Sequence, residues 1–505
     1  MKYEHLQKKI FLLSACIALS CTLLHTQVPW ESHGRLEVSA NGRYIQHEDG
    51  FPFLWIGDTG WGMIQQLTRE EIDQYLDNRQ DLGFTVIQSV VHWSPHGGGM
   101  KRSPDNAPNA YGHKPFAGEK DSPNTSEPSW MEGGSPEAPN DYWDHVAYVI
   151  QAARERNLYL ALLPCWAAHF VTGHQEYTEQ EARAYGKFLG DRYGQEPHII
   201  WVLGGDTNAQ FRGYDKNQNY GDYDYRGIYR AMAEGIVSGV TGRSPGWNEP
   251  DPAWDQVFLT YHPKGDYPYG SAQWFHQDAW LDANGVEVWK EVQDVYRAML
   301  DDYQLTDPVK PSLLLEGSYE YGSYRHECGW VTPVMVRRQL YHTFFAGGAG
   351  HTYGAAPVWA MRGSAGDYNC GFTWQQALGF PGAVQVAKTA REFLKNHHWH
   401  EWIPNGSVIS GAGGGINLKT AVTTRSGQMV LVYYTSHSSC RVNNILENDA
   451  EAYWFYPRNG RTIQALDFEA NESRVMVPPD KWEDAILVLH VNKEDELKTK
   501  SKISR

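Results

Sequence analysis

Short apolar runs alternate with amphipathic segments along most of this chain. Each run ends in turn residues, and the segment that follows has the spacing of a helix that buries one face. The runs predict strands at residues 53–61, 84–93, 158–166, 198–208 and 257–263, a weak sixth near Leu281, and two more at 312–316 and 351–354. The segments predict helices at residues 68–81, 141–157, 178–193, 228–240, 286–303, 334–345 and 383–394. This repeated strand–helix order predicts an α/β fold, a (β/α)8 TIM barrel.

Helix starts are marked by their own signals. Thr68 with Glu71, and Thr178 with Glu181, have the spacing of capping boxes, in which the threonine and the glutamate satisfy each other's backbone N–H groups. Asp141 is a further candidate N-cap. These signals fix where three of the predicted helices begin.

The pattern changes at both ends of the barrel region. Residues 34–50 read as a hairpin around Asn41-Gly42, a strong two-residue turn signal. Beyond residue 405, short alternating runs at 429–434, 452–457 and 485–490 predict strands of a C-terminal β-sandwich. We therefore expect two domains. Residues 34–400 form the (β/α)8 barrel with its N-terminal hairpin, and residues 405–495 form the β-sandwich.

Residues 1–21 predict a signal peptide. Lys8 and Lys9 precede an apolar stretch that is too short to span a membrane. Cys16 and Cys21 are alternative lipobox cysteines, so we expect an exported chain, periplasmic or at the cell surface, with a lipid anchor in the outer membrane as an open alternative. The net charge of −16 argues against a nucleic-acid partner, which would need basic patches.

Two predicted strands end in a carboxylate beside a glycine. Asp206 follows Gly204-Gly205, and Glu316 precedes Gly317. Parallel strands of one barrel bring their C-terminal ends to the same face, where barrel active sites lie. Each acid could instead cap the helix that follows it, but two such strand ends favour a catalytic pair.

Aromatic and imidazole side chains gather at the same predicted strand ends. Two carboxylates among such groups are typical of glycoside hydrolysis, in which one acid protonates the leaving oxygen and the other attacks the anomeric carbon or activates water. Tryptophan faces, with tyrosine or histidine donors, can hold a sugar. The candidate rim and substrate-binding residues are Asp58, Trp61, His92, Trp93, Trp166, His169, Asn208, Tyr261, His262, Tyr319 and His351.

No cofactor is expected. Neither a dinucleotide fingerprint nor a P-loop follows any predicted strand. No metal site is expected either, because His92 and His96 lie on a glycine-rich loop rather than in an HExxH helix, and a metallohydrolase would need a ligand set that the sequence does not assemble. Residues 94–140 form a long connection after the second strand, where we expect Trp130 or Tyr111 to contact substrate.

The segment 53–61, the turn 201–206 and the strand end at Leu315, Glu316 and Gly317 resemble glycoside hydrolase family 140, bacterial apiosidases that act on the pectin rhamnogalacturonan II. The likeness begins near residue 34 and includes a C-terminal domain of the collagen-binding type. It implies that Asp206 and Glu316 are the catalytic pair and that the substrate is a plant cell-wall polysaccharide. The alternative is a non-catalytic carbohydrate-binding or surface-adhesion protein on the same barrel. The oligomeric state stays unknown.

Overall fold

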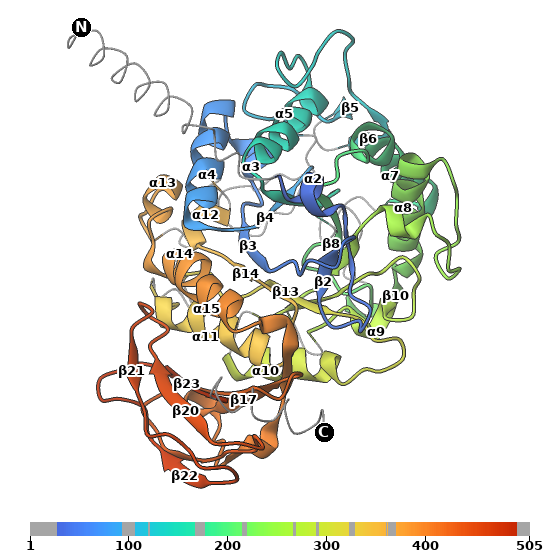
Figure 1. Cartoon of the computed structure of the whole chain (residues 1–505). Helices are drawn as coiled ribbons and strands as arrows, with labels where there is room; N and C mark the ends of the chain where they lie inside the picture. Colours follow the sequence, from blue (N-terminus) through green and yellow to red (C-terminus); the bar gives the residue numbers. More distant parts are fainter. Residues whose placement is uncertain are drawn as a thin grey trace, which may run out of the picture.

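The computed structural model describes residues 28–92, 107–119, 122–166, 177–214, 220–265, 269–288, 292–322, 329–359, 361 and 370–491. Within these ranges a barrel lies beside a smaller β domain, drawn in orange and red in Figure 1. No described helix is long and apolar enough to cross a membrane.

Eight parallel strands form the barrel. They are β3 (Trp55–Thr59), β4 (Val86–Val90), β7 (Tyr159–Leu163), β8 (Ile199–Gly204), β11 (Leu259–His262), β12 (Asn284–Glu287), β13 (Ser312–Glu316) and β14 (Gly350–Tyr353). Seven neighbouring pairs are joined by ladders in the order β11-β8-β7-β4-β3-β14-β13-β12. The barrel closes through a parallel bridge between Thr260 and Ala283, where the Thr260 hydroxyl donates to the Ala283 carbonyl at 2.8 Å. The predicted (β/α)8 barrel is therefore confirmed.

Helices surround these strands (Figure 1). The longer ones are α4 (Arg69–Leu82), α5 (Tyr142–Glu155), α7 (Glu179–Tyr193), α8 (Arg226–Thr241), α10 (Val292–Tyr303), α11 (Pro333–Phe345) and α15 (Arg391–Asn396). Both capping boxes form as predicted: Thr68 and Thr178 each accept from the backbone N–H three residues on, and Glu71 and Glu181 accept from the cap backbone. Asp141 caps α5 in the simpler way, through Asp144 N–H.

The sixth strand lies later than the sequence analysis predicts. It is β12, Asn284–Glu287, not a strand near Leu281, and the helix after it begins at Val292, not at Val286. Asn284-Gly285 is a poor strand signal by propensity. The strand needs this glycine because a Cβ on Gly285 would lie 1.9 Å from the Tyr261 carbonyl oxygen, so tertiary contact overrides propensity.

Strand alternation divides the barrel into two apolar layers. The lumen is filled by side chains that include Trp55, Val86 and Leu313. The opposite faces of the same strands pack on the helices, where Ile56 and Ile87 lie. Which layer a residue joins is set by its position in the two-residue repeat of the strand.

Hairpins are added at both ends of the barrel. At the N-terminal end, β1 (Leu36–Val38) pairs with β2 (Ile45–His47). At the face formed by the C-terminal ends of the barrel strands, here called the carboxyl rim, β5 (Phe116–Glu119) pairs with β6 (Ser122–Pro128) after β4, and β9 (Gln210–Tyr214) pairs with β10 (Tyr220–Asp224) after β8.

The C-terminal domain consists of two antiparallel sheets, consistent with the predicted β-sandwich. One sheet has the order β15-β17-β18-β23-β20-β21 and the other β16-β19-β22. Their bounds are β15 Trp402–Pro404, β16 Ile409–Ser410, β17 Lys419–Thr424, β18 Met429–Tyr434, β19 Cys440–Asn443, β20 Ala450–Phe455, β21 Thr462–Gln464, β22 Ser473–Met476 and β23 Ala485–Val491.

The larger C-terminal sheet shares a core with the barrel helices. Tyr433 and Val488 belong to the same buried cluster as Tyr341 and Phe345 of α11. Arg337 of α11 is 1% exposed, and it donates to both carboxylate oxygens of Asp484 at 2.9 and 2.8 Å. The Tyr433 hydroxyl donates to the same carboxylate at 3.0 Å.

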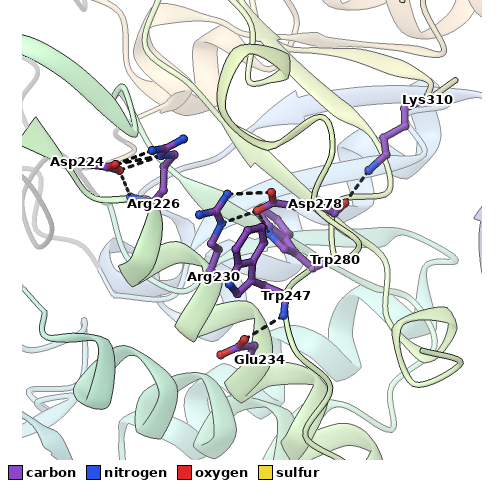
Figure 2. A network of polar contacts seen from close by, with 8 residues as sticks. All are labelled: Asp224, Arg226, Arg230, Glu234, Trp247, Asp278, Trp280 and Lys310. Atoms are coloured by element: carbon purple, nitrogen blue, oxygen red, sulfur yellow. Dashed lines mark hydrogen bonds and ion pairs between the residues drawn. The ribbon is translucent and has the colours of Figure 1, made fainter. Parts of the chain in front are cut away.

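A network of polar side chains, here called the Arg230 network, ties α8 to the connections before β12 and β13 (Figure 2). Arg230 donates twice to Asp278, at 2.7 and 2.9 Å, and its guanidinium lies 3.4 Å from the centre of the Trp247 ring. Asp278 also accepts from the Trp280 indole at 2.8 Å. Lys310 donates to the Asp278 backbone carbonyl at 2.8 Å.

Among the described cysteines, Cys165 and Cys440 are free, whereas Cys370 is disulfide-bonded. Cys328, Cys16 and Cys21 lie outside the described residues.

Candidate active site

The end of β8 turns sharply through three residues with positive φ, namely Gly204 at 94°, Gly205 at 112° and Asp206 at 48°. A Cβ on Gly204 would lie 2.3 Å from the His262 carbonyl oxygen, so only glycine fits there. Gly205 N–H donates to that same carbonyl at 2.9 Å. The turn therefore carries Asp206 next to β11, and the left-handed conformation at Asp206 is a local cost of that placement.

Glu316 reaches the carboxyl rim through an irregularity in β13. Val286 of β12 pairs with Leu314, but the next pair is Glu287 with Glu316, so Leu315 is an extra residue. Its carbonyl accepts from Gln88 of β4 at 2.6 Å. Bulges of this kind re-aim the following side chain. Here the bulge brings the Glu316 carboxyl to the side where Glu287 and His262 lie.

Four ionisable side chains from four strand ends meet at this point. Asp206, His262, Glu287 and Glu316 each present one atom that lies within 4.8 Å of the others. His262, Glu287 and Glu316 are buried, and Asp206 is partly exposed. We call this group the acid–imidazole cluster. It contains both acids that the sequence analysis predicts as a catalytic pair.

Aromatic side chains line the cluster. The Trp61 indole donates to the Tyr319 hydroxyl at 2.8 Å, and that hydroxyl bonds in turn to the Glu316 carboxyl. Burial, together with the Glu316 charge, raises the pKa of Tyr319 well above its usual value, which keeps the phenol a donor. The rings of Trp61 and Trp166 lie 5.4 and 5.6 Å from the His262 ring. The structure thus gathers these predicted rim residues around Glu316.

Glu287 is the residue that the sequence analysis missed. It ends β12 as Glu316 ends β13, and its side chain is 1% exposed. The signal was present, because Asn284–Glu287 is a short run that ends in a carboxylate. It was hidden by the misplaced sixth strand, which put Glu287 inside a helix.

Asp58 lies in the opposite layer from the cluster and is not placed to bind substrate. Its carboxylate accepts from the Tyr75 hydroxyl and from Arg79 Nε, both at 2.6 Å, and all three side chains are buried. Burial raises the pKa of Asp58, and the Arg79 charge opposes that rise. Asp58 shares the strand face of Ile56, which packs on helices, so its role is to anchor α4.

The prediction that Tyr261 and His351 bind substrate is wrong for the same reason, because both side chains lie in the layer that packs on the helices. Tyr261 packs on Tyr229 and Phe275 in the helical layer, and its hydroxyl donates to the Thr207 carbonyl at 2.9 Å. It therefore supports the Asp206 turn from behind. His351 is 1% exposed and lies 3.4 Å from the Thr343 hydroxyl of α11, and burial lowers its pKa to about 3.

The remaining predicted residues fall in three places. His92 is fully buried, with its ring 4.8 Å from that of Phe116 in β5. Asn208 is half-buried in the turn after Asp206. Trp93 and His169 lie outside the described residues. In the connection after β4, Tyr111 stacks on Arg69 at 4.0 Å and accepts from its backbone N–H at 2.8 Å, whereas Trp130 is 55% exposed.

The cluster also bears on the prediction that the protein has no metal site. The sequence analysis could not assemble a metal-ligand set, yet the cluster places three carboxyl groups and an imidazole within 4.8 Å. These are donor types that bind divalent cations. Because the set includes both predicted catalytic acids, the same geometry also fits a metal-free pair of carboxyl groups.

Comparison with known proteins identifies the family to which the chain belongs. A family model described as "Apiosidase-like, catalytic domain" matches residues 39–401, and one described as "Putative collagen-binding domain of a collagenase" matches residues 403–490. A search of curated proteins gave no match. A solved structure titled "Glycoside hydrolase" is 25% identical with a TM-score of 0.73, over 92% of this chain and 98% of that one.

A second solved structure, a glycoside hydrolase family 5 protein from Bacteroides vulgatus ATCC 8482, is 27% identical with a TM-score of 0.74, over 92% of this chain and 94% of that one. The first family model spans most of the chain, and the strand ends that carry Asp206 and Glu316 lie inside it. The chain therefore belongs to the apiosidase-like family and is a glycoside hydrolase.

Proposed function

We propose that this glycoside hydrolase is an apiosidase of the family 140 type, acting on side chains of the pectin rhamnogalacturonan II. Two things support the substrate: membership of the apiosidase-like family, and the resemblance carried by residues 53–61, 201–206 and 315–317. The reaction type rests on one observation, which is that the carboxyl groups of Asp206 and Glu316 approach within 4.8 Å at the carboxyl rim.

The separation favours a retaining mechanism. Retaining glycosidases hold their two carboxyl groups about 5–5.5 Å apart, whereas inverting enzymes need about 6.5–9.5 Å to admit a water. The nearest oxygens of Asp206 and Glu316 lie within 4.8 Å of each other, which is closer to the retaining than to the inverting separation. One carboxylate must then attack the sugar directly.

Glu316 suits the nucleophile and Asp206 the acid. The Tyr319 hydroxyl bonds to the Glu316 carboxylate and stabilises its charge, and His262 Nε2 lies 3.0 Å from Glu316 Oε2. Asp206 is more exposed and lies on a turn, where it can reach a leaving group. Glu316 attacks the anomeric carbon to form an ester while the glycosidic C–O bond breaks, and Asp206 gives its proton to the leaving oxygen. Asp206 then takes a proton from the water that displaces Glu316.

The location belongs to the proposal as well. Lys8, Lys9 and the apolar stretch after them support export to the periplasm or the cell surface, and Cys16 or Cys21 would carry a lipid anchor. A binding protein without activity is the weaker alternative, because such a protein would have no use for two acids held this close.

The decisive experiment is a digest of rhamnogalacturonan II side chains with identification of the released sugars. The wild type should release apiose, and Glu316→Ala should release none. Asp206→Ala should be slow on the polysaccharide but should recover on an aryl glycoside whose leaving group needs no proton, a contrast of about 10²–10⁴-fold.

Asp222→Ala, an exposed carboxylate of β10 near the same rim, is the matched control and should keep wild-type activity. Release of a different sugar would reject the apiosidase assignment but leave the catalytic pair standing. Wild-type activity in both Glu316→Ala and Asp206→Ala would reject the pair itself.

A further inference from the structure

Two buried atoms of the acid–imidazole cluster face each other without forming a hydrogen bond. His262 Nε2 lies 3.0 Å from Glu316 Oε2, and neither atom has a hydrogen-bond partner among the described residues. The His262 side chain is fully buried, and that of Glu316 is 9% exposed. Most buried polar atoms in folded proteins have a partner, so each exception calls for an explanation, and a bound ion is one.

The separation of these two atoms matches the spacing of ligands around a metal ion. Zinc and magnesium hold nitrogen and oxygen ligands at about 2.0–2.1 Å. Two such ligands at right angles therefore lie about 3.0 Å apart, and two on opposite sides of the ion about 4.2 Å apart. His262 Nε2 and Glu316 Oε2 already have the first spacing.

Asp206 and Glu287 extend this pair to four donors from four strand ends. One atom of each residue lies within 4.8 Å of the others, so the widest pair needs to close by at most about 0.6 Å to span a metal ion. The donor set of one imidazole nitrogen and three carboxyl oxygens suits divalent transition cations such as Mn²⁺ or Zn²⁺.

The strand ends that carry the donors also favour binding. Sites built on strands are held more precisely than sites on loops, so little order has to be gained when an ion enters. Asp206 is partly exposed, which opens the cluster toward the carboxyl rim. Ionised carboxyl groups at such close range repel one another, and a divalent cation among them offsets that repulsion.

We propose that the acid–imidazole cluster binds a divalent transition cation and that this cation inhibits hydrolysis. The binding rests on the geometry alone, whereas the inhibition rests on the proposed function. A carboxyl group must be deprotonated to bind a metal, so Asp206 could not hold the proton that it delivers to the leaving group. Glu316 would be bound through the oxygens that must attack the anomeric carbon.

The first test measures binding without any substrate. The full chain, purified without a histidine tag and freed of metal with a chelator, is titrated with MnCl₂ while electron paramagnetic resonance follows free Mn²⁺. The wild type should bind one Mn²⁺ per chain in the cluster. Glu287→Gln and His262→Gln should each weaken that binding by at least about 10–100-fold, the loss seen even for groups that only support a metal ligand.

The matched control is Glu320→Gln. Glu320 is a buried glutamate outside the cluster, which accepts from the Tyr353 hydroxyl and from Gly382 N–H. This variant should bind Mn²⁺ as the wild type does. A second reading needs no variant, because a cation that binds the folded chain should raise the melting temperature of the wild type as its concentration increases.

The second test measures inhibition on an aryl glycoside. Mn²⁺ should raise the apparent KM and leave kcat unchanged, because ion and substrate compete for the same carboxyl groups, and a chelator should reverse the effect. In Glu287→Gln, the inhibition constant should increase by the same factor as the dissociation constant, with the metal-free variant as its own reference. Glu320→Gln should be inhibited like the wild type.

The outcomes separate binding from inhibition. Failure of the wild type to bind Mn²⁺ would overturn the proposal, and so would binding that Glu287→Gln and His262→Gln both retain. Binding at the cluster of a protein that hydrolyses no glycoside would reject the proposed function but support the site. Activity that is lost on metal removal and restored by Mn²⁺ would overturn the inhibition, and with it the metal-free mechanism.

Discussion

The acid–imidazole cluster and the Arg230 network are both built on buried carboxylates, but they satisfy them in opposite ways. In the Arg230 network one carboxylate, Asp278, receives two bonds from Arg230 and one from Trp280, so three donors serve one acid. In the cluster, three carboxyl groups surround one imidazole. An acid that is fully paired with donors is typical of an interaction that stabilises the fold. Several carboxyl groups at close range destabilise the fold and are typical of a catalytic site.

The largest expected difference between the two regions is in activity. Glu316→Gln should reduce kcat by about 10⁴-fold or more, because it removes the proposed nucleophile. Its melting temperature should be equal to or higher than that of the wild type, since one of three neighbouring carboxylates becomes neutral. Steady-state kinetics and calorimetry on the same preparation measure both. A large drop in melting temperature would show that the cluster stabilises the fold, and the contrast would fail.

The reverse pattern is expected in the Arg230 network. Asp278→Asn should lower the free energy of unfolding by about 2–3 kcal/mol, because Arg230 would lose its charged partner. This decrease in the free energy of unfolding is smaller than that expected for a fully buried ion pair, because the Arg230 side chain is 17% exposed. At temperatures well below melting, kcat should stay at the wild-type value. A fall in kcat with unchanged melting would place this network in the catalytic machinery instead.

Asp302 offers a smaller and pH-dependent test of the same idea. It is buried on α10, where it accepts from the Ser312 hydroxyl at 3.3 Å, and burial raises its pKa to about 7. A raised pKa means that the folded state prefers the protonated acid. The penalty for ionising it is absent below the unfolded pKa of 3.8, grows as the pH rises and is complete above about 7.

Asp302→Asn, which is neutral at every pH, should therefore melt at a higher temperature than the wild type at pH 8 and at a similar temperature at pH 4. Melting curves across this range, with Asp301→Asn as an exposed neighbouring control, measure the effect. Equal gains at both pH values would mean that packing rather than charge is responsible.

The sequence predicted the barrel well because strand ends and capping boxes are local signals. Asp206 and Glu316 could be predicted to share the carboxyl rim because, in a barrel of parallel strands, two strands that end in acids bring both acids to the same face. Asp58, Tyr261 and His351 were misplaced because a residue near a strand end can face either layer, and the two-residue repeat must be applied to decide which.

The remainder of the site depends on features that no local pattern carries. The bulge at Leu315 re-aims Glu316, and only the pairing register with β12 reveals it. Glu287 was hidden because Gly285 weakens the strand signal, although close contact with β11 requires that glycine. Both are consequences of contacts between distant parts of the chain.

The pairing of Arg337 with Asp484 has a consequence for how the chain is made. The two residues are 147 positions apart, so a growing chain completes α11 long before it supplies the partner of Arg337. Until β18 and β23 have both emerged, the face of α11 that packs on Tyr433 and Val488 stays incompletely covered. The outer face of α11 is thus covered only after Asp484 and β23 have been made, and a chain cut short before Asp484 would present an apolar face and a guanidinium without its carboxylate partner to proteases.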